Sequence, residues 1–191
     1  MVTNGYIIMT IFGIIGGIGS GKTLSMVYLL TQDAMKRDKK IMSNIRINMP
    51  QAEMMSPELL QDLTANLKNY SMGIDEAHNV MESRSSSNTK VKQRSHFILQ
   101  SRHAGQGSLD IYYTTQYKSQ VDKRLRLNTD VWVYPLIVAW EDVGKKKKIP
   151  THMIITYVFK KGQQMIDTSE LVYIKPIIDM YDTHEIVPLD L

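Results

Sequence analysis

One run of eight residues near the amino end restricts the possible folds more than any other feature of this sequence. It reads Gly16-Gly17-Ile18-Gly19-Ser20-Gly21-Lys22-Thr23 and fits the pattern G-x-x-x-x-G-K-[ST] in full. A short apolar run rich in isoleucine precedes it, and a stretch with helical spacing of apolar residues follows it. The run therefore predicts a phosphate-binding loop (Walker A motif) between a buried strand and a helix.

The residue types of this loop explain how it would hold ATP. Glycines let successive backbone N–H groups converge on one anion, and the amino end of the next helix adds partial positive charge. Lys22 is expected to reach the β- and γ-phosphates, and the Thr23 hydroxyl to ligate Mg²⁺. The residues expected to bind nucleotide are Gly16, Gly17, Ile18, Gly19, Ser20, Gly21, Lys22, Thr23 and Leu24.

Two carboxylates follow a second predicted strand, residues 70–74. Asp75 is expected to hold the metal, directly or through water, and Glu76 to act as general base on the attacking water. His78, in the sequence Asp-Glu-Ala-His, either relays nucleotide state to a substrate or is an ordinary polar helix residue.

Polar groups also close the predicted strand at residues 109–114. Gln116 is expected to contact the γ-phosphate or its water, with help from Thr115, although capping of the strand end explains the same residues. An arginine from a neighbouring subunit could neutralise charge during phosphoryl transfer. Arg102 and Arg124 are preferred for this role over Arg84 and Arg126, and each could equally be a solvated surface arginine.

Helices and strands alternate in the first two-thirds of the sequence, which predicts an α/β fold with a mostly parallel sheet flanked by helices. The last third is rich in strands. We expect one domain over residues 1–191, with a nucleotide-binding core at 1–130 and additional strands at 131–191. Further strands are expected at 6–15, 41–47, 131–140, 153–159 and 171–174. A helix of about 16 residues is expected after the loop, and further helices are expected at 56–68, 89–103 and 119–127.

Charge is distributed unevenly along the chain. Lys and Arg number 23 and Asp and Glu 19, a net charge of +4, yet residues 84–126 hold nine basic and two acidic side chains. That stretch could contact the DNA backbone, through Arg84, Lys90, Lys92 and Arg94, or could be a solvated face. Lys145–Lys148 is expected to form a hairpin tip. The absence of cysteine excludes disulfides, thiolate nucleophiles and cysteine-ligated metals.

The apolar runs are too short to span a bilayer, and no signal-peptide pattern is present. We therefore expect a protein of the cytoplasm.

The motifs in this order resemble the ATPase domain of zonula-occludens-toxin-like proteins, in the FtsK–HerA superfamily of P-loop ATPases. The resemblance covers roughly residues 6–186 and is carried by the loop, by Ile-Asp-Glu-Ala-His, by Phe-Ile-Leu-Gln-Ser-Arg-His-Ala-Gly, by Asp-Ile-Tyr-Tyr-Thr-Thr-Gln, by Gln-Val-Asp-Lys-Arg-Leu-Arg and by the closing Tyr181-Asp182-Thr183-His184-Glu185.

The resemblance implies an additional-strand, RecA-like core assembled as a ring, usually hexameric, in which ATP hydrolysis at subunit interfaces drives DNA through a pore. It assigns nucleotide roles to Lys22, Thr23, Asp75, Glu76 and Gln116. Phage-assembly members usually carry a transmembrane segment and an extracytoplasmic domain after the ATPase, and this sequence shows neither. We therefore expect a viral packaging motor for double-stranded DNA, in the cytoplasm of an infected host cell or associated with a virion, with capsid or membrane vertex proteins as further partners. The alternatives are an extrusion ATPase acting on single-stranded DNA and a nucleotide-gated switch.

Overall fold

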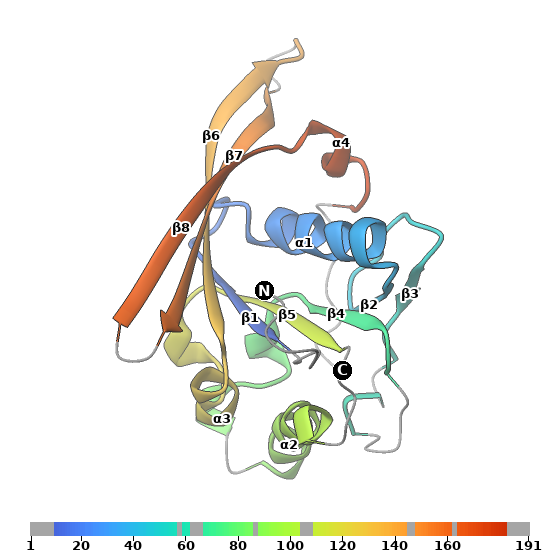
Figure 1. Cartoon of the computed structure of the whole chain (residues 1–191), viewed down its shortest axis with the longest axis vertical. Helices are drawn as coiled ribbons and strands as arrows, with labels where there is room; N and C mark the ends of the chain where they lie inside the picture. Colours follow the sequence, from blue (N-terminus) through green and yellow to red (C-terminus); the bar gives the residue numbers. More distant parts are fainter. Residues whose placement is uncertain are drawn as a thin grey trace.

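The fold is known from a computed structural model that describes residues 10–56, 59–61, 67–85, 88–103, 109–144, 148–161 and 164–182. Its centre is an eight-stranded sheet in the order β3-β2-β4-β5-β1-β6-β7-β8 (Figure 1). The strands on the parallel side are β1 (Ile11–Ile15), β2 (Lys40–Ser43), β3 (Ala52–Met54), β4 (Tyr70–Ile74) and β5 (Asp110–Thr115).

Pairing within the sheet changes from parallel to antiparallel across its width. β3, β2, β4, β5, β1 and β6 (Val131–Asp142) pair in parallel, whereas β6, β7 (Lys148–Lys161) and β8 (Gln164–Tyr173) pair antiparallel. The mostly parallel α/β fold with a strand-rich last third is therefore confirmed. β5 lies between β1 and β4, so the strand before the phosphate loop and the strand before Asp75 are separated by one strand.

Helices cover the two faces of the sheet (Figure 1). α1 (Lys22–Arg37) and the short α4 (Lys175–Ile178) cover one face, and α2 (Thr89–His103) and α3 (Lys123–Leu127) cover the other. Side chains alternate along β5: Tyr112 packs in the core under α1, while Ile111 and Tyr113 pack in the core under α2 and α3. Short 3₁₀ turns complete the described elements, at Leu59–Gln61 (η1), Ala77–Asn79 (η2), Ser83–Ser85 (η3) and Lys118–Gln120 (η4).

Several element predictions match closely, and others need correction. The 16-residue helix after the loop, the strand at 70–74 and the helix at 89–103 are confirmed. The strand expected at 41–47 ends at Ser43, because the Asn44 side chain bonds to the backbone beyond β4. The helix expected at 56–68 is a 3₁₀ turn at Leu59–Gln61 in the part the structure describes, and residues 67–69 already form the turn into β4.

The strands of the last third are longer than expected, because antiparallel pairing of β6, β7 and β8 carries exposed polar residues along with apolar ones. The helix expected at 119–127 is divided into η4 and α3, and β3 was not predicted. Lys148 begins β7 opposite Asp142. Residues 145–147 lie outside the described part, so the expected hairpin tip stays a prediction. No helix in the described ranges is both long enough and apolar enough to cross a bilayer.

At the edge of the sheet opposite the phosphate loop, an ionic network built on two buried carboxylates ties α1 to β4 and β5. Asp110 accepts hydrogen bonds from Arg37 at 2.6 Å and from Lys39 at 2.7 Å. Asp33 accepts from Arg37, and also from Ser71 of β4 and Tyr112 of β5. Burial lowers the pKa of Lys39, although the neighbouring Asp110 opposes that shift. Every carboxylate here has partners, as burial of charge requires.

Candidate functional site

The phosphate loop connects β1 to α1 at the carboxyl edge of the parallel strands. Gly19 (φ 77°) and Gly21 (φ 92°) lie in the left-handed region, which glycine enters without steric cost, and α1 begins at Lys22. The Lys22 ammonium lies over the loop and donates to the carbonyl oxygen of Gly17 at 3.1 Å. The Leu24 side chain is buried in the core, so only its backbone N–H, in the first turn of α1, can face an anion.

Asp75 stands directly after β4 and accepts hydrogen bonds from two other elements. The Thr23 hydroxyl donates to its carboxylate at 3.0 Å, and the Thr114 hydroxyl of β5 donates at 2.7 Å. Burial raises the pKa of Asp75, although these two hydrogen bonds oppose the shift. The arrangement brings two hard oxygen ligands together at the start of α1, a donor set that suits Mg²⁺ bound to nucleotide phosphates.

Asn44 fixes the backbone at this point and was not predicted from the sequence. Its side-chain amide donates to the carbonyl oxygen of Asp75 at 2.9 Å, and its side-chain oxygen accepts from the Asp75 N–H at 2.7 Å. Thr114 was also missed. Thr115, which was expected to assist at the site, instead donates to the backbone carbonyl of Tyr117 and to Gln120, because successive strand residues point to opposite faces.

Glu76 adopts a left-handed backbone conformation (φ 49°, ψ 51°), which is unusual for a non-glycine residue. Its N–H donates to the Thr114 hydroxyl at 2.8 Å. Its carboxylate oxygen Oε2 lies 3.2 Å from Nδ1 of His78. Both atoms are enclosed, and within the described residues neither has an aligned hydrogen bond. The side chain of the expected general base thus lies beside His78.

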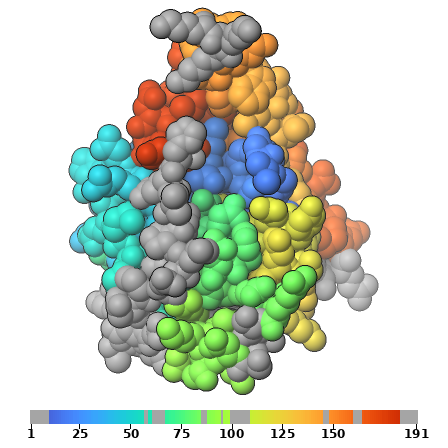
Figure 2. Space-filling model, turned by 180° about the vertical axis from the view of Figure 1, so that it is seen from behind, coloured from blue at the N-terminus to red at the C-terminus, as the bar shows by residue number. Residues whose placement is uncertain are grey.

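Gln116 directly follows β5, beside the first residue of the phosphate loop, because Thr115 pairs with Ile15 of β1. It is half-buried, and its expected contact with the γ-phosphate stays a prediction. The phosphate loop, the segment after β4 and the segment after β5 meet on one face of the molecule, where blue, green and yellow surfaces adjoin (Figure 2).

The candidate trans-acting arginines differ in their surroundings. Arg124 lies in α3 with its side chain 46% exposed and its guanidinium 3.4 Å from Asp122. Arg126 donates to the backbone carbonyl of Lys118. The backbone of Arg102 lies in α2, and its side chain is outside the described part of the structure. The role of each in a neighbouring subunit stays a prediction.

The four residues expected to bind DNA do not share one environment. Arg84, Lys90 and Lys92 are exposed. Arg94 is only 5% exposed and donates to the backbone carbonyl of Val80, and its burial lowers its pKa. The prediction that Arg94 contacts DNA is therefore wrong. It lies on the face of α2 that buries Val91, Phe97 and Ile98, as helical spacing dictates.

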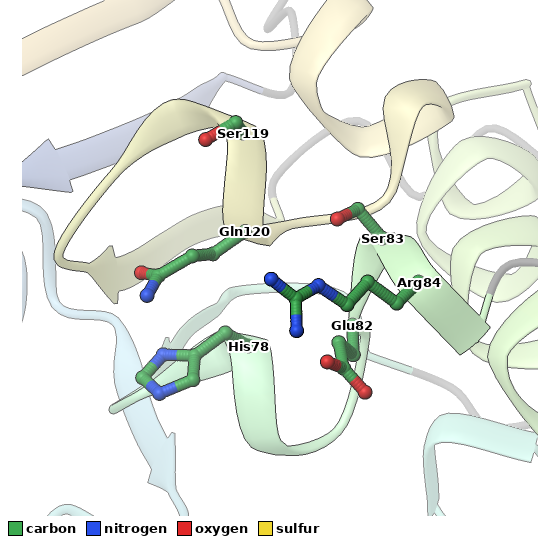
Figure 3. A pocket seen from close by; sticks show the side chains of 6 residues that line it. All are labelled: His78, Glu82, Ser83, Arg84, Ser119 and Gln120. Atoms are coloured by element: carbon green, nitrogen blue, oxygen red, sulfur yellow. The ribbon is translucent and has the colours of Figure 1, made fainter.

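A pocket of about 360 Å³ opens between the turns after β4 and the turn after β5 (Figure 3). Both strands end at the carboxyl edge, so the pocket lies on the same edge of the sheet as the phosphate loop. Its lining residues are polar: His78, Glu82, Ser83, Arg84, Ser119 and Gln120.

The similarity of this chain to known proteins lies in its fold. No protein-family model matches the chain, and no curated protein does. Among solved structures, the N-terminal domain of zonular occludens toxin from Neisseria meningitidis superposes with a TM-score of 0.62 and 19% identity, covering 92% of this chain and 100% of that domain.

The genome-packaging NTPase B204 from Sulfolobus turreted icosahedral virus 2 has the same fold. Its complex with ATP-gammaS superposes with a TM-score of 0.53 and 15% identity, over 83% of this chain and 96% of that chain. Its complex with sulfate superposes with a TM-score of 0.55 and 12% identity, over 86% of this chain and 98% of that chain. The resemblance suspected from the motifs thus extends to the fold as a whole.

Proposed function

We propose that this chain is a Mg²⁺-dependent ATPase that moves double-stranded DNA through a homo-oligomeric ring, as a viral genome-packaging motor. The observation that carries the ATPase is the meeting of Thr23 and Asp75 at 3.0 Å beside Lys22. Packaging is supported by the fold shared with B204, a genome-packaging NTPase solved with ATP-gammaS. The strand between β1 and β4 supports a RecA-like core.

Each residue of the site has its own role in ATP hydrolysis. Lys22 leaves the Gly17 carbonyl to neutralise the phosphates, and the loop N–H groups hold them in place. Thr23 and Asp75 would ligate Mg²⁺, which when bound neutralises charge that develops on the phosphate oxygens. Asn44 keeps the Asp75 backbone in position, and Gln116 orients the γ-phosphate or its water. Glu76 takes the proton of the attacking water once its carboxylate turns away from His78.

A substitution at Glu76 tests this assignment. Glu76→Gln is expected to bind ATP and to lower turnover by roughly 10²- to 10⁴-fold, the usual contribution of a general base. The matched control is Glu53→Gln, which removes the same charge from an exposed position on β3. ATP hydrolysis and binding of a fluorescent ATP analogue are measured for both. A Glu76→Gln variant that turns over like the control contradicts the assignment.

A second candidate function is an assembly ATPase that extrudes single-stranded DNA. It is favoured by the higher TM-score and complete coverage of the zonular occludens toxin domain. Hydrolysis measured with duplex and with single-stranded DNA of equal nucleotide content separates the two. Greater stimulation by duplex supports the packaging motor, and greater stimulation by single strands supports extrusion.

A further inference from the structure

The pocket beside the active site has the composition of a phosphate-binding site. Gln120 is held in one orientation, because its side-chain oxygen accepts from the Tyr117 N–H at 3.1 Å. Its amide nitrogen is therefore the atom available to the pocket. The hydroxyls of Ser83 and Ser119 line the same cavity and can also donate.

Arg84 supplies the cation. Its guanidinium extends into the pocket between His78 and Gln120 (Figure 3). Among the described residues, the Arg84 guanidinium has no hydrogen-bond or ion-pair partner. An arginine with its planar donors directed into a polar cavity is suited to bind the oxygens of a phosphate.

The charge of the pocket lining indicates which kind of phosphate group the pocket would bind. Arg84 is the basic residue of the lining and Glu82 is the acidic one. The formal charges of these two side chains cancel. Such a pocket suits the single negative charge of a phosphodiester better than the higher charge of a terminal phosphate. The phosphodiester is the repeating group of a DNA backbone.

His78 connects this pocket to the catalytic carboxylate. Its ring lines the pocket, and its Nδ1 is the atom that lies 3.2 Å from the enclosed Oε2 of Glu76. The two atoms are in contact without an aligned hydrogen bond, so a ligand that hydrogen-bonds to His78 from the pocket side can turn the ring away from Glu76. Glu76 is then free to turn toward the nucleotide.

We propose that the pocket of His78, Arg84 and Gln120 binds a backbone phosphodiester of DNA, and that this binding draws His78 away from Glu76 and so permits hydrolysis. The inference rests on the proposed ATPase function. It adds a specific docking point for the DNA, and it assigns to His78 the role of obstructing the general base until DNA arrives.

Binding of a short fluorescent duplex without nucleotide tests the docking point. Arg84→Gln is expected to weaken binding about tenfold, through loss of a charge-assisted hydrogen bond, and to lower the salt slope by about one. The matched control is Lys36→Gln, an equal charge loss at an exposed position in the last turn of α1. Arg84→Gln with the affinity of the control overturns the site.

ATP hydrolysis tests the coupling. His78→Ala is expected to raise the rate without DNA several-fold and to bring the stimulation by DNA close to one. If DNA stimulates hydrolysis by His78→Ala as strongly as it stimulates the wild type, the coupling between the pocket and Glu76 is overturned. If Arg84→Gln instead raises the KM for ATP without DNA and leaves duplex affinity intact, the phosphate comes from a neighbour's nucleotide and the phosphodiester assignment falls. A wild-type protein that does not hydrolyse ATP contradicts the proposed function, whereas the nucleotide-free binding assay still decides on the pocket.

Discussion

Removal of the Asn44 side chain gives a direct test of how the metal-binding carboxylate is held. Asn44 is buried and makes two hydrogen bonds, of 2.9 and 2.7 Å, to the backbone of Asp75. Asn44→Ala leaves the N–H and the carbonyl oxygen of Asp75 without these partners inside the protein. Each unsatisfied buried group costs about 1–3 kcal/mol. Because the two groups belong to one peptide segment that can relax, we expect a loss of about 2–4 kcal/mol of unfolding free energy.

The measurement is urea denaturation of the metal-free protein, together with the Mg²⁺ dependence of nucleotide binding. Asn128→Ala is the matched control, because Asn128 makes a single side-chain hydrogen bond, to the Arg124 carbonyl in an exposed position. We expect the control to cost roughly 0.5–1 kcal/mol and to leave the Mg²⁺ dependence unchanged. Asn44→Ala should shift that dependence to higher Mg²⁺. A variant as stable as the control, with an unchanged Mg²⁺ dependence, refutes the role assigned to Asn44.

Two further predictions concern stability. Gly73→Ala is expected to destabilise the protein by about 1–3 kcal/mol, as overpacking of a core does, because the new Cβ would lie 2.6 Å from Leu30 Cδ1. Thermal unfolding checks this, and an unchanged melting temperature contradicts it. Asp75→Asn is expected to stabilise the metal-free protein at neutral pH. Burial raises the folded-state pKa of Asp75, so its favourable contribution is complete below pH 4 and is lost as the pH rises through the folded-state pKa. Denaturation in chelator from pH 4 to 7 should show that the unfolding free energy of Asp75→Asn exceeds that of the wild type by an amount that grows with pH. A difference that is constant or absent contradicts the predicted direction.

The sequence predicted those parts of the site whose chemistry is local. The phosphate loop and the strand before Asp75 have short patterns whose physical requirements can be recognised without the rest of the chain. Asn44 and Thr114 could not be found in this way. Their roles arise because β2 and β5 flank β4, and the order of strands in a sheet depends on packing over the whole domain.

The error at Arg94 has a different cause. The count of basic residues treated all charges between 84 and 126 as equivalent. The structure buries Val91, Phe97 and Ile98, and helical spacing places position 94 on the same face. His78 lies beside Glu76, a neighbour that its position in the sequence motif does not identify.

The ionic network at the far edge of the sheet has a mechanical consequence. The elements that it joins, α1, β4 and β5, meet again at the opposite edge through Thr23, Asp75 and Thr114. At the far edge all partners are side chains of the protein, whereas at the near edge Thr23 and Asp75 must exchange partners when a metal ion enters. α1 is thus fixed at its carboxyl end. Its 16 residues span about 24 Å, so a displacement of ~1 Å at the loop corresponds to a rotation of only about 2° around that anchor.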